Sequence, residues 1–135
     1  MSLNGPVLTS SFELVLERNP KLTERFYEIF FTRYPQVKPL FGTNSTEAQA
    51  EMLATALVSV IDHLDDAPWL TQNLRALGLR HVDYGVSPDM YAWVGECLLA
   101  AMAEAAGGDW TKDIEVEWTK AYGAIVQLML TPAPA

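Results

Sequence analysis

The sequence predicts an all-α fold, because its apolar residues follow a helical period and no segment alternates between apolar and polar as a strand would. Four stretches place apolar residues three and four positions apart: 22–31, 52–64, 90–102 and 114–129. Proline, glycine and small polar residues interrupt the chain between them, at 19–20, 35–39, 42–46, 65–68, 85–88 and 107–109. Together these signals predict six or seven helices and no strand.

The helix boundaries follow in chain order. A first helix covers about residues 6–18, and the second ends before Pro35. Two later helices are expected to begin at N-cap residues, which are Ser45 or Thr46 for one and Ser87, followed by Pro88, for the other. The last two helices are the longest, and the short turn at 107–109 makes them antiparallel neighbours. Residues 131–135 form a flexible tail.

Length, charge and cysteine content restrict the class of protein. A chain of 135 residues suits a single domain over 1–135, with its core at about 4–130. Nine basic against 17 acidic residues give a net charge of −8, which disfavours binding to nucleic acid or to an anionic membrane surface. The single cysteine, Cys97, excludes an internal disulfide framework; it lies on an apolar stripe, so we expect a buried, inert thiol. With no secretory signal and no apolar stretch of ~20 residues, a cytoplasmic protein is expected.

The sequence lacks the common catalytic motifs, such as a phosphate-binding loop or a nucleophile elbow. Its two histidines, His63 and His81, lie on different predicted helices. His63 belongs to an acidic run and is expected at a solvated helix end. One chemistry needs a single protein ligand, because haem iron already has four porphyrin nitrogens and one imidazole leaves the sixth position open. A helical chain rich in large apolar residues with one well-placed histidine suits such a site.

Five short motifs occur in order along the chain: Phe26-Tyr27, Tyr34-Pro35-x-Val37-x-Pro39-Leu40-Phe41, Arg80-His81-x-x-Tyr84-Gly85-Val86, Tyr91-x-x-Val94-Gly95-x-x-Leu98-Leu99 and Trp118-Thr119-Lys120-Ala121-Tyr122-Gly123. In this order and at this spacing they resemble the single-domain bacterial haemoglobins and the haem domain of flavohaemoglobins, over about residues 4–130. The resemblance implies the globin fold, a three-over-three sandwich of helices around one haem b.

The resemblance also implies roles for individual residues. His81 matches the proximal iron ligand of the family. Arg80 and Tyr122 match positions that face the haem propionates, where a guanidinium suits a carboxylate. Phe41 matches the aromatic residue that stacks on the distal side of the haem. The remaining residues of the implied pocket are apolar and contribute packing: Leu53, Leu77, Val86, Val94 and Leu98.

Tyr27 and Gln49 match the distal residues of the family, and the distal side decides what a haem does. Gln49 lies one turn before Leu53, so the two share a helix face. Bound O2 carries partial negative charge, and a hydrogen bond from the Tyr27 hydroxyl would be worth about 1.5–3 kcal/mol, roughly a factor of 10 to 100 in O2 retention. Because CO develops less charge, this pair should favour O2 over CO.

Two departures from the family pattern concern turnover. Tyr91 matches a tyrosine that, together with a C-terminal glutamate, forms a hydrogen-bonded set with the proximal histidine. The glutamate position falls near residues 131–133, where this sequence has no acid, so the set looks incomplete and peroxidase-like chemistry is weakened. No flavin or nicotinamide domain follows in this sequence, so catalytic turnover is expected to need an external reductase.

Three functional hypotheses follow. The first is an O2-binding globin that stores or transports O2 or converts nitric oxide to nitrate, with O2, NO or CO as ligands. The second keeps the haem but takes peroxide or nitrite as substrate, with Tyr27 as proton donor and Tyr91 behind His81. A haem-based gas sensor remains open beside it. The third is a haem-free helical interaction or sensor module.

Overall fold

The structure is a computed structural model that describes residues 5–41, 45–83 and 85–130, and within them every regular element is helical. Tyr84 and the expected tail at 131–135 lie outside the described residues. The elements are, in order, α1 (Gly5–Arg18), α2 (Leu22–Arg33), η1 (Pro35–Phe41), α3 (Thr46–Asp62), α4 (Ala67–Asp83), α5 (Pro88–Ala106), η2 (Gly107–Asp109) and α6 (Lys112–Leu130). The prediction of an all-α fold is confirmed.

Local chemistry explains where the helices begin. The Ser45 hydroxyl accepts a hydrogen bond from the Ala48 amide at 3.1 Å and so caps α3, as expected. At the start of α4 the Asp66 carboxylate accepts from the Trp69 amide at 3.1 Å. Ser87 occupies the N-cap position before α5, but its hydroxyl makes no capping hydrogen bond. There the fixed backbone angle of Pro88 at the first helical position favours the helix start instead.

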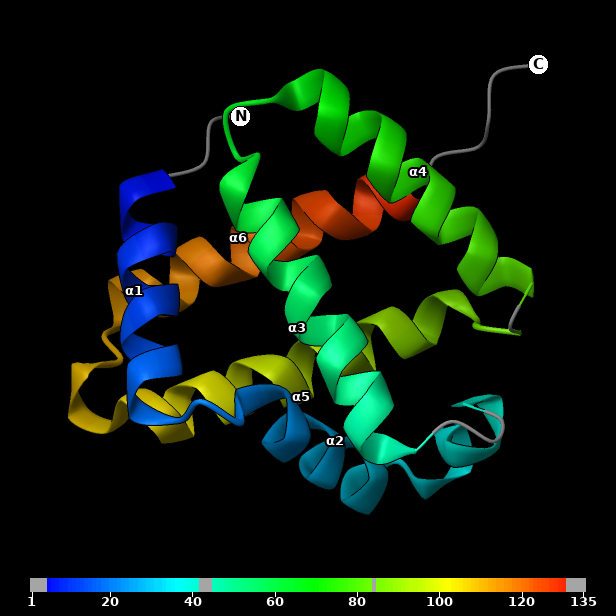
Figure 1. Ribbon diagram of the computed structural model, residues 1–135, viewed down its shortest axis with the longest axis horizontal. Helices are drawn as coiled ribbons and strands as arrows, with labels where there is room; N and C mark the ends of the chain where they lie inside the picture. Colours follow the sequence, from blue (N-terminus) through cyan, green and yellow to red (C-terminus); the bar gives the residue numbers. More distant parts are fainter. Residues whose placement is uncertain (1–4, 42–44, 84, 131–135) are drawn as a thin grey trace.

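The helices pack in pairs that are not adjacent in the sequence (Figure 1). The most extensive contacts join α2 to α5 and α4 to α6. The consecutive helices α5 and α6 also touch, as the short turn between them predicts, but each packs more extensively on another helix. A glycine permits the α4–α6 crossing, because a methyl group on Gly78 would overlap the Met129 carbonyl.

The buried apolar residues form two separate clusters. The large cluster joins α1, α2, η1, α5 and the first part of α6, and it includes Leu8, Phe26 and Met102, which are at most 2% exposed. The small cluster has three buried members, Leu74 of α4, Tyr91 of α5 and Met129 of α6. Helix α3 contributes one buried residue, Ala50, to the large cluster and partly buried residues to both clusters. None of the described helices is long and apolar enough to cross a membrane.

Candidate functional site

His81 lies in the last turn of α4 with its imidazole half-buried. The ring Nδ1 is 2.8 Å from the Leu77 carbonyl oxygen, one turn earlier on the same helix. Because a carbonyl oxygen only accepts, Nδ1 carries the proton and Nε2 carries the lone pair. This hydrogen bond therefore fixes both the orientation of the ring and the nitrogen that can bind a metal.

Tyr91 lies beside His81, with the two ring centroids 6.0 Å apart and the ring planes tilted by 31°. The Tyr91 side chain is 6% exposed, and burial raises the pKa of its hydroxyl. Among the described residues this hydroxyl has no hydrogen-bond partner. His81 thus has a neutral carbonyl as the acceptor of its Nδ1 proton and a phenol nearby.

Tyr122 supports Tyr91 from α6. Its hydroxyl donates a hydrogen bond to the Tyr91 carbonyl oxygen at 2.5 Å, and burial raises its pKa. The ring fits because Gly95 has no side chain; a methyl group there would lie 2.6 Å from the ring edge. The Tyr122 hydroxyl has one proton, and it donates that proton to the Tyr91 carbonyl oxygen. In this geometry Tyr122 therefore holds the backbone of Tyr91, the residue beside His81, in place. Its propionate contact stays a prediction, as does that of Arg80, which is exposed on α4.

Tyr27 occupies the buried face of α2, as expected, and is 6% exposed. Its ring meets Phe41 edge-on, with centroids 5.6 Å apart, and packs on Phe26 at 4.8 Å. Burial raises the pKa of Tyr27 to about 12, so the hydroxyl keeps its proton throughout the neutral pH range. The structure therefore places a protonated phenol beside the predicted distal aromatic residue.

The other predicted pocket residues divide between the two clusters. Phe41, Leu53, Val94 and Leu98 belong to the large cluster together with Tyr27, whereas Leu77 and Val86 pack on the small cluster with Tyr91. Gln49 is half-buried on α3, one turn before Leu53. The predicted distal and proximal residues therefore lie in different clusters, which is the division expected if a flat apolar group is held between them.

The donor set of this site fits a haem. Among the described residues, no three His, Cys, Asp or Glu side chains gather where they could hold a bare metal ion. His81 can therefore serve as a single ligand to an iron that brings its own four nitrogens. The apolar lining from both clusters suits the porphyrin faces.

Two expectations about other reactive residues have different outcomes. His63 lies at a helix end, as expected, because it is the C-cap residue of α3, but it is half-buried and not solvated. Its ring stacks on Trp69 with centroids 3.7 Å apart, and its Nδ1 is 2.7 Å from the Ser59 carbonyl oxygen. It closes the corner between α3 and α4. Cys97 is fully buried and burial raises its pKa to about 11, which confirms the inert thiol.

One functional group of the site was not singled out from the sequence. The Leu77 carbonyl accepts the His81 proton, although Leu77 was expected only as apolar lining. The spacing of four residues on one helix could have indicated this contact, because that carbonyl faces the side chain one turn later. The sequence alone does not single out this acceptor, because a carbonyl inside a helix is already expected to accept a hydrogen bond from a backbone amide.

The chain is similar to known proteins over nearly its whole length. The family described as Globin matches residues 24–129. An uncharacterized globin-like protein of Aquifex aeolicus is 30% identical over 125 residues, covering 93% of this chain and 88% of that protein. A flavohemoprotein of Vibrio cholerae is 28% identical over 126 residues, covering 92% of this chain and 32% of that protein. The chain thus spans about a third of the length of its flavohemoprotein relatives.

Solved structures agree with these relatives. An engineered carbene transferase, described as a putative nitric oxide dioxygenase from Rhodothermus marinus, is 27% identical with a TM-score of 0.80 and covers 93% of this chain and 87% of that chain. A bacterial globin from Campylobacter jejuni is 25% identical with a TM-score of 0.79, covering 93% of this chain and 91% of that chain. The chain belongs to the globin family, and this membership implies that it binds haem.

Proposed function

We propose that this globin holds one haem b between its two clusters, with Nε2 of His81 as the protein ligand of the iron. The hydrogen bond from Nδ1 to the Leu77 carbonyl supports this role because, in the neutral ring, it makes Nε2 the nitrogen with the lone pair that a metal needs. Arg80, exposed one residue earlier, would meet a propionate. When bound, haem supplies the iron that takes up O2 and the electron chemistry for oxidising nitric oxide to nitrate.

The observation that carries the proposed O2 binding is the Tyr27 hydroxyl. It is buried, it stays protonated because its pKa is about 12, and it lies beside Phe41, the residue that we propose stacks on the haem from the same side. A phenol in this position donates a hydrogen bond to a small ligand that carries partial negative charge. In a dry pocket that bond is worth about 1.5–3 kcal/mol. Gln49, half-buried on α3, would orient or share it.

The proximal side supports O2 binding more than peroxide or nitrite chemistry. A carboxylate that accepts a hydrogen bond from the proximal imidazole increases its electron donation to iron. Here the described acceptor of the His81 proton is a neutral carbonyl, and the Tyr91 hydroxyl has no described partner. The peroxide- or nitrite-reactive alternative therefore has less support.

Nitric oxide dioxygenation requires one electron for each turnover to restore ferrous iron. The flavohemoprotein relatives extend well beyond the part that this chain matches. We propose that a reductase supplies this globin with these electrons. The reducing cytoplasm, where a free thiol such as Cys97 is normal, is the proposed compartment.

The test is the Tyr27→Phe variant, compared with Tyr34→Phe as the control. Tyr34 lies at the end of α2, where its hydroxyl donates to Glu96 at 2.8 Å on the protein surface. Stopped-flow displacement of O2 by CO should show O2 dissociation at least about tenfold faster in Tyr27→Phe and unchanged in Tyr34→Phe. CO dissociation should change much less in either variant. Equal O2 dissociation rates in Tyr27→Phe and the parent protein would contradict the proposal.

A further inference from the structure

The α4 helix differs in charge from the rest of the chain. The protein has 17 acidic and nine basic residues, yet positions 67–82 contain no Asp or Glu. The same positions contain Arg75 and Arg80. Most of α4 is therefore a positive segment in a protein of net charge −8.

Arg75 also differs from the arginines of α1 and α2. Each of those forms an ion pair with a carboxylate from α5 or η2: Arg18 with Asp109, Arg25 with Glu104 and Arg33 with Glu96. Among the described residues, Arg75 has no carboxylate close enough for an ion pair, and its Nε is buried without a hydrogen-bond partner. Because the buried Nε is out of reach of another molecule, it is the terminal Nη1 and Nη2 of this half-buried side chain that suit an anionic group from a partner.

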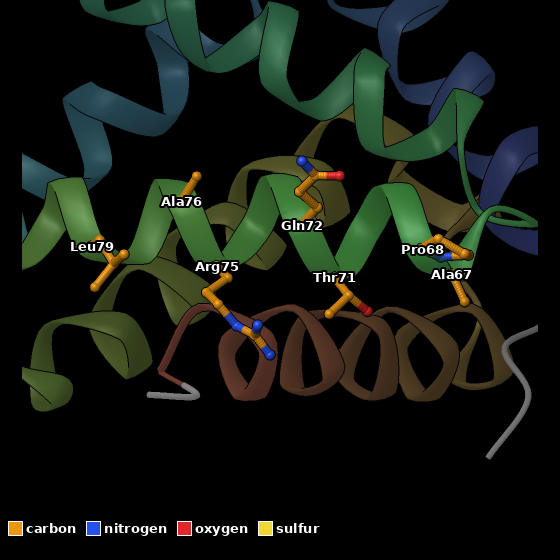
Figure 2. A pocket seen from close by; sticks show the side chains of 7 residues that line it. All are labelled: Ala67, Pro68, Thr71, Gln72, Arg75, Ala76 and Leu79. Carbon is orange, nitrogen blue, oxygen red and sulfur yellow. The ribbon is translucent and has the colours of Figure 1, made fainter. Parts of the chain in front are cut away.

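A hollow of about 540 Å³ runs along α4 and is lined by residues from both sides of the helix, Arg75 among them (Figure 2). Figure 2 shows Arg75 and Thr71 on one side of the helix and Gln72 and Ala76 on the other. Two apolar side chains continue this face toward the end of the helix, because residues four and seven positions after Arg75 share its side. They are Leu79, 50% exposed, and Val82, 63% exposed.

We propose that this surface, the α4 face (Thr71, Arg75, Leu79 and Val82), docks an acidic electron-donor protein whose carboxylates surround its redox cofactor. With haem held by His81, one electron would pass from the donor's reduced cofactor to the ferric iron, which would become ferrous, and no covalent bond would form or break. The inference rests on the proposed function, which needs such a donor. Charge complementarity disfavours a second copy paired through a two-fold axis, because Arg75 would then approach its own symmetry mate.

The position of the α4 face suits electron delivery. His81 lies on the inner side of the same helix, and a helix with its side chains is about 10–12 Å across. A donor cofactor at the α4 face would therefore lie about one helix diameter from the iron ligand. Electron-transfer complexes are small, below about 1,200 Å², and opposite charges steer their formation. A short row of residues with one unpaired arginine is sufficient for such a contact.

The experiment uses the haem-loaded protein and a plant-type [2Fe–2S] ferredoxin, an acidic one-electron donor. Binding of oxidised ferredoxin is followed by calorimetry at low and high salt, and ferric protein is then reduced by reduced ferredoxin in a stopped-flow instrument. Arg75→Glu is compared with Lys21→Glu, an exposed position between α1 and α2 that changes the net charge equally. Reduction by dithionite serves as the control for the haem site.

We expect Arg75→Glu to weaken ferredoxin binding and to slow reduction by ferredoxin at least about tenfold, with dithionite reduction unchanged. Lys21→Glu should stay within about twofold of the parent, and salt should weaken the parent complex. Arg75→Gln, which keeps a long polar side chain, should show a smaller loss in the same direction. Leu79→Ser should weaken binding with little effect on its salt dependence.

Three results would overturn the inference: no binding of ferredoxin by the parent protein at low salt, equal losses in Arg75→Glu and Lys21→Glu, or a dimer in sedimentation that Arg75→Glu dissociates. The binding measurement does not require O2 chemistry. Normal O2 dissociation in Tyr27→Phe together with Arg75-dependent ferredoxin binding would therefore reject the proposed function and keep the docking surface.

Discussion

The two hydrophobic clusters of this globin are built differently. The large cluster is dense in aromatic contacts, with Phe26 and Phe30 stacked at 5.3 Å and Phe41 edge-on to Tyr27 at 5.6 Å. The small cluster has three buried members, and one of them, Tyr91, has a hydroxyl without a described partner. His81 belongs to this less densely buried side. The comparison indicates that the large cluster holds the fold together, while the small cluster lies beside His81, the proposed iron ligand.

This division has a thermodynamic consequence. A region with few buried apolar contacts opens more easily than a dense core, and a ligand that binds only the folded form stabilises it. Haem in contact with His81 should therefore stabilise α4 and its surroundings more than α1, α2 and α5. Variants in the two clusters should then differ in how strongly their effects depend on haem.

The largest expected effect is that of Phe26→Ala in the large cluster. Phe26 is 2% exposed, and truncating a buried phenylalanine lowers the free energy of unfolding by about 3–5 kcal/mol. The loss should be similar with and without haem, measured by urea denaturation followed by circular dichroism. Leu130→Ala, at a position 42% exposed, is the control and should change stability by less than about 0.5 kcal/mol. If Phe26→Ala lowered the free energy of unfolding by less than about 1.5 kcal/mol, the large cluster would not be the main source of the stability of the fold.

The next effect concerns the α4–α6 crossing. In Gly78→Ala the added methyl group would overlap the Met129 carbonyl, so the helices must separate, at a cost of about 1–3 kcal/mol. Because Gly78 lies one turn before His81, haem affinity should fall as well. Titration with hemin and thermal unfolding measure both. Gly123→Ala, where nothing lies near the added methyl group, should have neither effect. Unchanged haem affinity in Gly78→Ala would show that the crossing does not position His81.

The smallest effects come from two tyrosines of the proximal side. Tyr122→Phe removes the hydrogen bond to the Tyr91 carbonyl and should cost about 1 kcal/mol. Tyr91→Phe removes a hydroxyl that has no described partner, so stability should change little. The iron–histidine stretching frequency in resonance Raman spectra should also stay unchanged in Tyr91→Phe. A shift of that frequency would show that the phenol polarises His81 after all.

Much of the fold could be predicted from the sequence, because helix periodicity and capping are local. Ser45 caps α3 and the breaks at proline and glycine fall where expected. The partners of each helix could not be predicted, since α4 meets α6 through Gly78 and Met129, which are far apart in the chain. Met52 begins an apolar repeat yet is 54% exposed, because the face that α3 buries depends on its neighbours.

The candidate site divides in the same way. The resemblance to bacterial haemoglobins identified His81 and Tyr27, and the structure adds what surrounds them: a carbonyl acceptor for one and aromatic rings for the other. The stacking of His63 on Trp69 and the use of the Tyr122 hydroxyl by Tyr91 depend on contacts between helices. No local pattern reports such contacts, so they could not be found from the sequence.

The measurement that tests the central claim most directly is the absorption spectrum of the His81→Gly variant beside that of the parent protein. The parent, reduced with dithionite and then exposed to air, should give a five-coordinate ferrous spectrum that converts to a stable two-banded O2 complex. His81→Gly should lose this conversion, and added imidazole should restore it by occupying the ligand position. Identical spectra for the two proteins without imidazole would contradict the assignment of His81 as the iron ligand.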